Sequence, residues 1–241
     1  LKRLTLKEFN IDICGEFIFL NIESKKTLKQ YLGKYYKELK NISINLGSEI
    51  KTNIFHYNAN WKVCIENTID EYHVASVHPN TFNKVLGSEI KYDYDKLNNG
   101  VQINCNKKFL KKWKPIENKI NDRGYKINGY RHIFIYPLFT AASTLGTSFS
   151  LQWFRPISEN KTEIISRLFS FNLKKEKNEI TNFLDNSVEK FNHEVFHEDK
   201  EVCEDVHNGL LKKEFSKQFG ILGKNESRIV HFHKNYLRNI K

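Results

Sequence analysis

The sequence predicts an α+β fold in which an antiparallel β-sheet carries helices on one side. Between about residues 85 and 172, four segments are rich in β-branched and aromatic residues, and Gly, Asn and Pro separate them. They read VQINCN (101–106), YRHIFIYPLF (130–139), SFSLQWFRPI (148–157) and TEIISRLFSF (162–171). Helical patterns precede and follow this block. Strands grouped together, with helices grouped apart from them, are typical of α+β folds.

The remaining elements follow from apolar periodicity, in chain order. Phe17–Asn21 reads as a short strand, and Thr27–Leu39 as an amphipathic helix. The apolar face of that helix consists of Leu28, Tyr31, Leu32, Tyr35 and Leu39. One helix is predicted over Asn60–His78. Two long helical segments, roughly 174–190 and 193–217, close the chain.

Composition indicates one domain over residues 1–241. The chain has only four prolines, no segment that reads as a linker, and no apolar run of the roughly 20 residues that a membrane helix needs. The four cysteines are scattered without a CxxC pair, which predicts neither a disulfide framework nor a cysteine zinc site. We therefore expect a soluble protein of a reducing, cytoplasmic compartment.

The stretch NWKVCIENTIDEYHVASVH is the main candidate for a functional site. It holds two histidines and three polar neighbours, namely Glu66, Asn67, Asp70, His73 and His78. Residues five apart on an ideal helix diverge by about 140°, so the two imidazoles meet only if the helix ends or bulges. The proline after His78 favours such an end, because it biases the preceding residue out of helical geometry. Spacing alone leaves both a metal site and a chance histidine pair open.

A carboxylate suited to the same site lies near the end of the chain. Read as a helix, residues 193–210 place Asp199 on an apolar stripe with Val195, Val202 and Val206. A lone buried carboxylate is costly unless a cation neutralises it, although a lysine or histidine in an ordinary core would also serve. The other acids here are expected to be solvated: Glu194, Glu198, Glu201, Glu204 and Asp205.

The combined pattern of N-W-K, E-N and D-x-Y-H-x-x-x-x-H-P resembles the iron-binding segment of Rieske-type ring-hydroxylating oxygenase large subunits. The string E-D-x-x-x-x-E-x-V-x-x-G-L from Glu198 to Leu210 resembles a second motif of that family. The resemblance implies that His73, His78 and Asp199 bind mononuclear iron(II). It also implies a helix-grip, START-like catalytic domain, with the sheet wrapped around a long helix and an apolar tunnel.

The resemblance assigns further roles around the iron. Asp70 matches the catalytic acid that links the iron to an incoming cluster and orients His73. Asn67 matches a polar residue near the metal, and Tyr72 is expected to pack beside the site. We expect an oxygenase that activates O2 to hydroxylate or demethylate a small aromatic compound or quaternary amine.

The electron-transfer part of such an enzyme is not visible in this sequence. GEFIFLN near the start resembles the piece that follows the Rieske domain, and the end, with Glu226, His231, Phe232 and His233, resembles the last helix of the catalytic domain. A Rieske [2Fe–2S] cluster needs C-x-H and C-x-x-H pairs, and neither occurs. We expect the cluster in a missing N-terminal domain, the chain being a fragment of a longer reading frame. The family also implies a reductase or ferredoxin donor and a homotrimer.

Pocket residues are expected among the aromatic positions of the strands. The candidates are Phe134, Tyr136, Phe139, Leu151 and Trp153. Tyr136 and Trp153 would suit an aromatic cage for a cationic amine. The small residues of LFTAASTLGTSFS, residues 138–150, would leave room for a ligand.

The sequence leaves three alternatives to the oxygenase to consider. A zinc hydrolase fits poorly, because HVASVH lacks the spacing of known helical zinc signatures. A nucleic-acid module is disfavoured despite a net charge of +11, because the basic residues are spread along the whole chain. The densest group, Lys107 to Lys114, looks like an amphipathic surface segment. A non-catalytic helix-grip domain that binds a small ligand, with a degenerate metal site, remains the main alternative.

Overall fold

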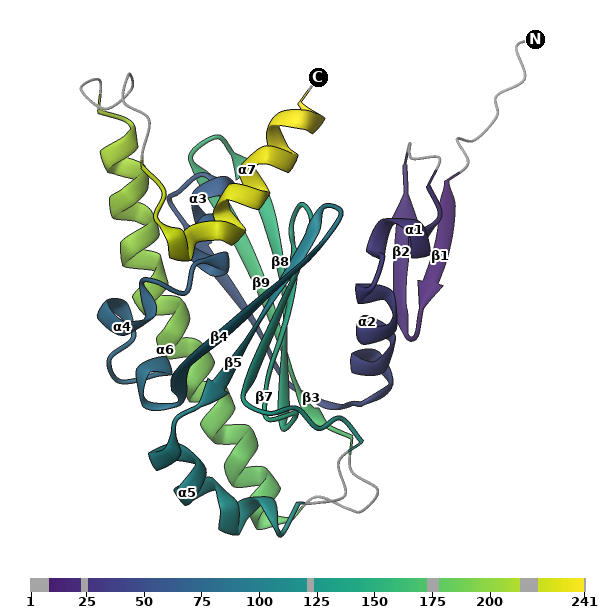
Figure 1. Ribbon diagram of the computed structural model, residues 1–241, viewed down its shortest axis with the longest axis vertical. Coiled ribbons are helices and arrows are strands. Elements are labelled where there is room, and N and C mark those ends of the chain that lie inside the picture. The colour runs from purple at the N-terminus through teal and green to yellow at the C-terminus, as the bar shows by residue number, and fades with distance from the viewer. Residues whose placement is uncertain (1–8, 23–25, 121–123, 173–177, 213–220, 241) are drawn as a thin grey trace.

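The computed structural model describes residues 9–22, 26–120, 124–172, 178–212 and 221–240. Its core is a seven-stranded antiparallel sheet in the order β3-β9-β8-β7-β6-β5-β4 (Figure 1). The strands are β3 (Leu46–Tyr57), β4 (Leu86–Asp95), β5 (Asn98–Cys105), β6 (Tyr130–Ile135), β7 (Phe139–Thr144), β8 (Ser148–Ser158) and β9 (Lys161–Phe171). A separate hairpin pairs β1 (Asn10–Cys14) with β2 (Phe17–Asn21). The predicted α+β fold with an antiparallel sheet is confirmed.

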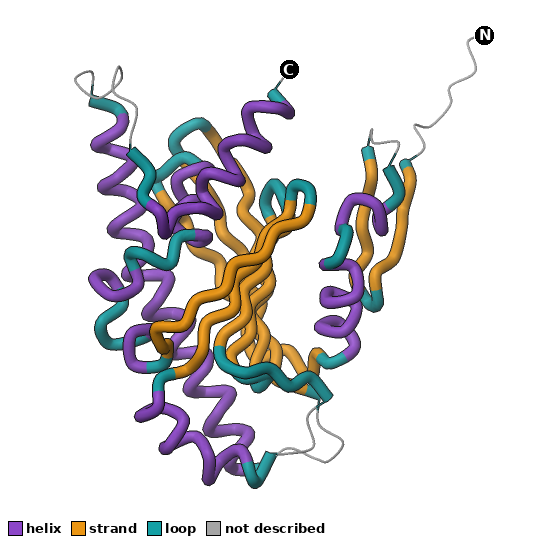
Figure 2. Tube along the Cα trace, viewed as in Figure 1, coloured by secondary structure: helices purple, strands orange, loops and turns teal. Residues whose placement is uncertain are grey.

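The helices lie on both faces of this sheet (Figure 2). The prediction that they cover only one face was therefore wrong. They are α1 (Leu28–Leu32), α2 (Tyr35–Ile44), α3 (Trp61–Ile69), α4 (Val74–Val77), α5 (Lys107–Glu117), α6 (Glu179–Leu210) and α7 (Ser227–Asn239), with 3-10 turns η1 (Phe82–Lys84) and η2 (Lys224–Glu226). Leu32 and Tyr35 pack with Ile133 in one core cluster, and Phe196 and Phe232 pack with Phe134 in another. Since neighbouring strand residues point to opposite faces, the two clusters cover opposite sides of β6.

Several predicted boundaries were wrong. The helix predicted over Thr27–Leu39 is divided at Gly33, whose φ of 58° suits glycine. The strand predicted over 130–139 ends at Ile135, and a turn containing Pro137 leads into β7. The two helices predicted at the end of the chain form a single helix. Helix α6 begins after its capping residue Asn178 and continues without a break to Leu210. The predicted ends at 174–177 and 213–217 lie outside the described residues.

Four further elements, β1, β3, β4 and β7, were not predicted as strands. The basic amphipathic segment is helix α5, which buries Trp113. Within the described ranges, no helix has both the length and the apolar character needed to cross a membrane.

Candidate metal centre

The two predicted histidines meet because α3 ends early and a single helical turn follows it. Helix α3 starts at the cap Asn60, whose side chain accepts from the Lys62 N–H, and it stops before Asp70, which is extended. The prediction of one helix over Asn60–His78 was therefore wrong. His73 and His78 stand at the two ends of α4. His78 leaves helical geometry, with φ −112° and ψ 49°, as the following proline predicted.

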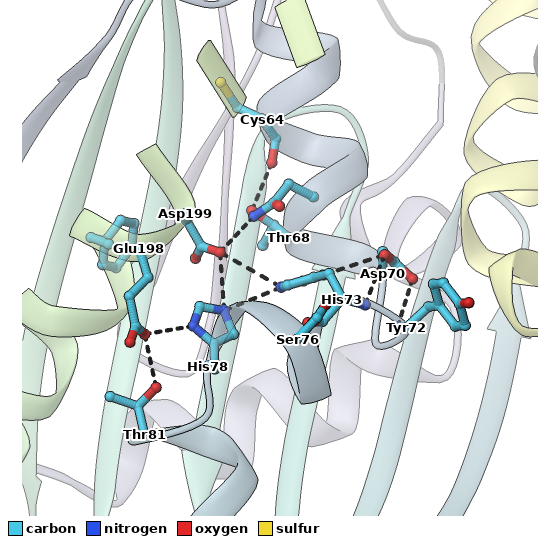
Figure 3. Close-up of polar contacts among 12 residues, drawn as sticks. Cys64, Thr68, Asp70, Tyr72, His73, Ser76, His78, Thr81, Glu198 and Asp199 are labelled. Carbon is cyan, nitrogen blue, oxygen red and sulfur yellow. Dashed lines mark hydrogen bonds and ion pairs between the residues drawn. The ribbon is translucent and has the colours of Figure 1, made fainter. Parts of the chain in front are cut away.

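Asp199 of α6 completes a compact group with these histidines (Figure 3). The Nε2 atoms of His73 and His78 are 3.2 Å apart. Asp199 Oδ1 lies 3.1 Å from His78 Nε2 and 3.6 Å from His73 Nε2. The His78 side chain is only 1% exposed, and the other two are 15% exposed. Side chains from two distant parts of the chain thus direct three potential ligand atoms at one point.

A carboxylate oxygen lies within hydrogen-bond distance of the outer ring nitrogen, Nδ1, of each histidine. Asp70 Oδ2 lies 3.3 Å from His73 Nδ1, and Glu198 Oε2 lies 2.7 Å from His78 Nδ1. An ionised carboxylate only accepts hydrogen bonds, so both Nδ1 atoms carry the proton. In the neutral histidines, both Nε2 lone pairs then face Asp199 Oδ1. Three acceptors at this distance repel one another unless a cation joins them.

This donor set fits a divalent metal. Two imidazole nitrogens and one carboxylate oxygen on one side of an ion are the facial arrangement found in non-haem iron(II) oxygenases. Asn67 Nδ2 donates to Asp199 Oδ1 at 2.8 Å, which orients the carboxylate. Outer partners of this kind are a regular part of protein metal sites.

Three carboxylates, of Asp70, Glu198 and Asp199, contact the two histidines. Burial lowers the pKa of His78, but hydrogen bonds to Asp199 and Glu198 and the charges of both acids outweigh it, and the pKa lies above its usual value. A positive charge at His78 is therefore favoured, whether a proton or a metal ion supplies it.

Sequence comparison identifies the family. Residues 36–241 match the family model for the ring hydroxylating alpha subunit, catalytic domain. The chain belongs to this family. The predicted resemblance is confirmed over most of the chain, and the matched range contains all three candidate ligands. No curated protein matches the chain in sequence.

Solved structures of ring-hydroxylating and related Rieske oxygenases share the fold. The quaternary ammonium Rieske monooxygenase CntA, in complex with its substrate L-carnitine, superposes with a TM-score of 0.71 and 15% identity over 95% of this chain. Naphthalene 1,2-dioxygenase from Rhodococcus sp., bound to indole, superposes with a TM-score of 0.69 and 12% identity over 95% of this chain. The chain spans 60% of the CntA chain and 65% of the naphthalene dioxygenase chain. Dicamba monooxygenase, bound to dicamba, gives a TM-score of 0.57 and 11% identity over 95% of this chain and 68% of that one.

Three sequence-based expectations about this family site need correction. Tyr72 does not pack beside the metal centre, because it is 72% exposed; its backbone N–H donates to Asp70 Oδ1 at 2.7 Å. Glu198 is not a merely solvated charge, since it bonds both His78 and Thr81. The apolar stripe beside Asp199 does not continue to Val206, which is 46% exposed.

A cavity of about 360 Å³ opens from the candidate metal centre between the sheet and the helices. His73, His78 and Asp199 contribute to its wall. Strand residues on the cavity side include Tyr130, His132, Ala142, Ser150 and Gln152. Residues with small side chains do leave room here, as the segment 138–150 predicted: Ala142, Ser143, Thr144, Thr147, Ser148 and Ser150 all line the cavity.

None of the five predicted pocket residues lines this cavity. Phe139, Leu151 and Trp153 belong to the core cluster that packs against α1 and α2, and the Phe139 and Trp153 rings are 5.0 Å apart. Phe134 and Tyr136 pack against Phe232 of α7, with ring centroids 5.8 and 6.2 Å away. These five residues pack in the two cores, and the residues of β7 and β8 that line the cavity are mostly smaller or polar. An aromatic cage of Tyr136 and Trp153 is therefore excluded.

Proposed function

We propose that this chain is the catalytic domain of a Rieske-type terminal oxygenase, which hydroxylates or demethylates a small organic substrate with O2. The convergence of His73 Nε2, His78 Nε2 and Asp199 Oδ1 on the wall of a cavity carries the proposal. Family membership supports it independently, since it rests on sequence over residues 36–241.

His73, His78 and Asp199 would hold the iron. When bound, iron(II) would supply open coordination positions for the reductive activation of O2. The protein's own part is to fix the three ligands and to exclude bulk water. Glu198 holds His78 in the tautomer that presents Nε2, and Asp70 does the same for His73.

Asp70 is also our candidate for the catalytic residue on the electron path. Its carboxylate accepts from the His73 and Tyr72 backbone N–H groups as well as from His73 Nδ1. Its side chain is 14% exposed and adjoins the exposed Tyr72. This position between the metal centre and the surface suits a link to a Rieske [2Fe–2S] cluster. We propose that a neighbouring subunit of a homotrimer provides that cluster, and that a reductase or ferredoxin reduces it.

The cavity suits a small substrate, with aromatic compounds and quaternary amines as the candidate classes. Its wall is mostly apolar and aromatic, including Phe82, Phe149 and Phe191. Pockets of this kind bind ligands mainly through apolar contact, with a few polar groups for orientation.

Anaerobic metal analysis tests the proposal. The unaltered chain is expected to hold about one iron per chain, and His73→Ala and Asp199→Ala to lose it. His193→Ala and Asp205→Ala are matched controls, because both residues lie exposed on α6. Zinc in place of iron would favour a hydrolase. Failure to bind iron after anaerobic reconstitution would leave a small-ligand-binding domain with a degenerate metal site.

A further inference from the structure

The cavity wall contains a buried hydrogen-bond donor that has no partner. His132 of β6 is 2% exposed and lines the cavity. Its Nδ1 atom lies 2.8 Å from Arg228 Nη2. A guanidinium group can only donate, so Nδ1 must accept and Nε2 must carry the proton. Among the residues that the structure describes, nothing accepts a hydrogen bond from His132 Nε2.

Arg228 holds the histidine in this state. The arginine is 1% exposed, donates to Asn99 Oδ1 at 2.7 Å, and forms an ion pair with Glu71. Its position is therefore fixed by α7, β5 and the segment after α3 together, and Glu71 balances its charge. Burial and the adjacent Arg228 hold the pKa of His132 well below its usual value, so the ring is neutral. His132 Nε2 is thus a neutral, buried N–H donor in a set orientation.

This donor lies along the wall that starts at the metal centre. Ring contacts run from His78 to Phe82 at 5.6 Å, from Phe82 to Tyr130 at 5.3 Å, and from Tyr130 to His132 at 6.3 Å. In the sheet, His132 is paired with Ala142, which is paired with Ser150 on the next strand. Both neighbours have small side chains and line the cavity. A ligand that fills this part of the cavity therefore lies against small side chains beside His132, whose unpaired Nε2 is itself buried.

We propose that His132 Nε2–H is a specificity determinant of the cavity, which selects an apolar molecule that carries an oxygen acceptor such as a carbonyl group. Burying a donor without a partner is costly, so a ligand that supplies an acceptor is favoured over an otherwise identical hydrocarbon. This inference deepens the proposed function, because it names the substrate class of the same site. Its test, however, needs no turnover.

The experiment compares two probes of the same carbon skeleton, 1-tetralone and tetralin, binding to the purified chain. We expect 1-tetralone to bind about tenfold more tightly, the difference that one net hydrogen bond gives. Equal affinities would overturn the inference, since a water molecule would then satisfy Nε2 in both cases. Iron content is measured on the same samples. If the chain prefers 1-tetralone but cannot hold iron, the result would support the inference about His132 and contradict the proposed oxygenase function.

A variant pair assigns the preference to His132. His132→Phe is expected to bind the two probes equally, while Phe191→Leu, which alters an apolar part of the wall, weakens both and keeps the preference. A preference that persists in folded His132→Phe would overturn the assignment. If that variant does not fold, nuclear magnetic resonance of ¹⁵N-labelled histidine in the unaltered chain decides. The His132 Nε2–H signal should shift with 1-tetralone and not with tetralin, and an unchanged signal would contradict the proposal.

Discussion

Glu198 Oε2 accepts a hydrogen bond from His78 Nδ1 at 2.7 Å, so the acid that precedes Asp199 on α6 orients another residue of the candidate metal centre. The same carboxylate oxygen accepts from Thr81 Oγ1 at 2.9 Å. Two adjacent residues of one helix thus contact the two ring nitrogens of His78, Glu198 on the outer side and Asp199 on the inner side.

We expect Glu198→Ala to weaken iron(II) binding by about 10- to 100-fold, the usual effect of losing an outer partner of a metal ligand. Glu198→Gln should lose less, because its amide oxygen can still accept from Nδ1. The dissociation constant is measured anaerobically by competition with a chelator. Glu194→Ala, on an exposed position of α6, is the control. Equal affinity in Glu198→Ala and the control would show that Glu198 does not position His78.

Asp70→Asn should separate iron binding from reactivity. The amide oxygen can still accept from His73 Nδ1, so we expect full iron content, whereas the lost charge should slow product formation by about 10- to 100-fold. Both are measured with a Rieske domain and reductant supplied. Tyr72→Phe is the control, because it keeps the backbone bond to Asp70. Loss of iron in Asp70→Asn would count against this division of roles.

The candidate metal ligands could be proposed from the sequence because local spacing and residue identity carry that signal. His73 and His78 are close in the chain, and the residue before a proline leaves a helix for a local steric reason. Glu198 could not be predicted in the same way. On α6 alone it points away from the buried stripe, and only the packing of α4 against α6 brings His78 to it.

The pocket could not be predicted because strand alternation defines two sets of residues without saying which set faces a cavity. On β6, β7 and β8 one set contains Ile133, Ala141 and Leu151, and the other contains His132, Ala142 and Ser150. The helices α1 and α2 cover the first set, and the cavity lies before the second. Large apolar side chains close a space by packing, so the smaller and more polar set was the better signal.

A leucine at neighbouring positions of β7 should distinguish these two faces. Ala141 is 1% exposed in a core cluster, so we expect Ala141→Leu to lower the free energy of unfolding by about 1–3 kcal/mol through overpacking. Ala142→Leu enters the cavity and should cost less stability, but it should weaken 1-tetralone binding. Urea unfolding and probe titration measure the two effects. The reverse order of stabilities would mean that the cavity is not open at Ala142.

The last prediction concerns Arg131, which joins α2 to the sheet. It donates to both carboxylate oxygens of Glu38, at 2.7 and 2.8 Å, and to Asp93 at 2.5 Å. Burial raises the pKa of Asp93, but hydrogen bonds from Arg131 and Tyr35 and the charge of Arg131 outweigh it and lower the pKa from 3.8 to about 2. A lowered pKa stabilises the fold above the unfolded value, so this contribution is complete above pH 3.8 and is lost as the pH falls to about 2.

We expect Arg131→Met to lower the free energy of unfolding at neutral pH by about 3 kcal/mol, because two partly buried carboxylates lose their shared cation. The variant should also lose less stability than the unaltered chain between pH 3.8 and about 2, since the pKa of Asp93 then lies closer to its usual value. Denaturant unfolding across this range measures both. Arg155→Met is the control, because that arginine is 62% exposed and its ion pair with Glu163 should contribute less than about 1 kcal/mol. Identical acid dependence in Arg131→Met and the unaltered chain would show that the guanidinium does not set the pKa of Asp93.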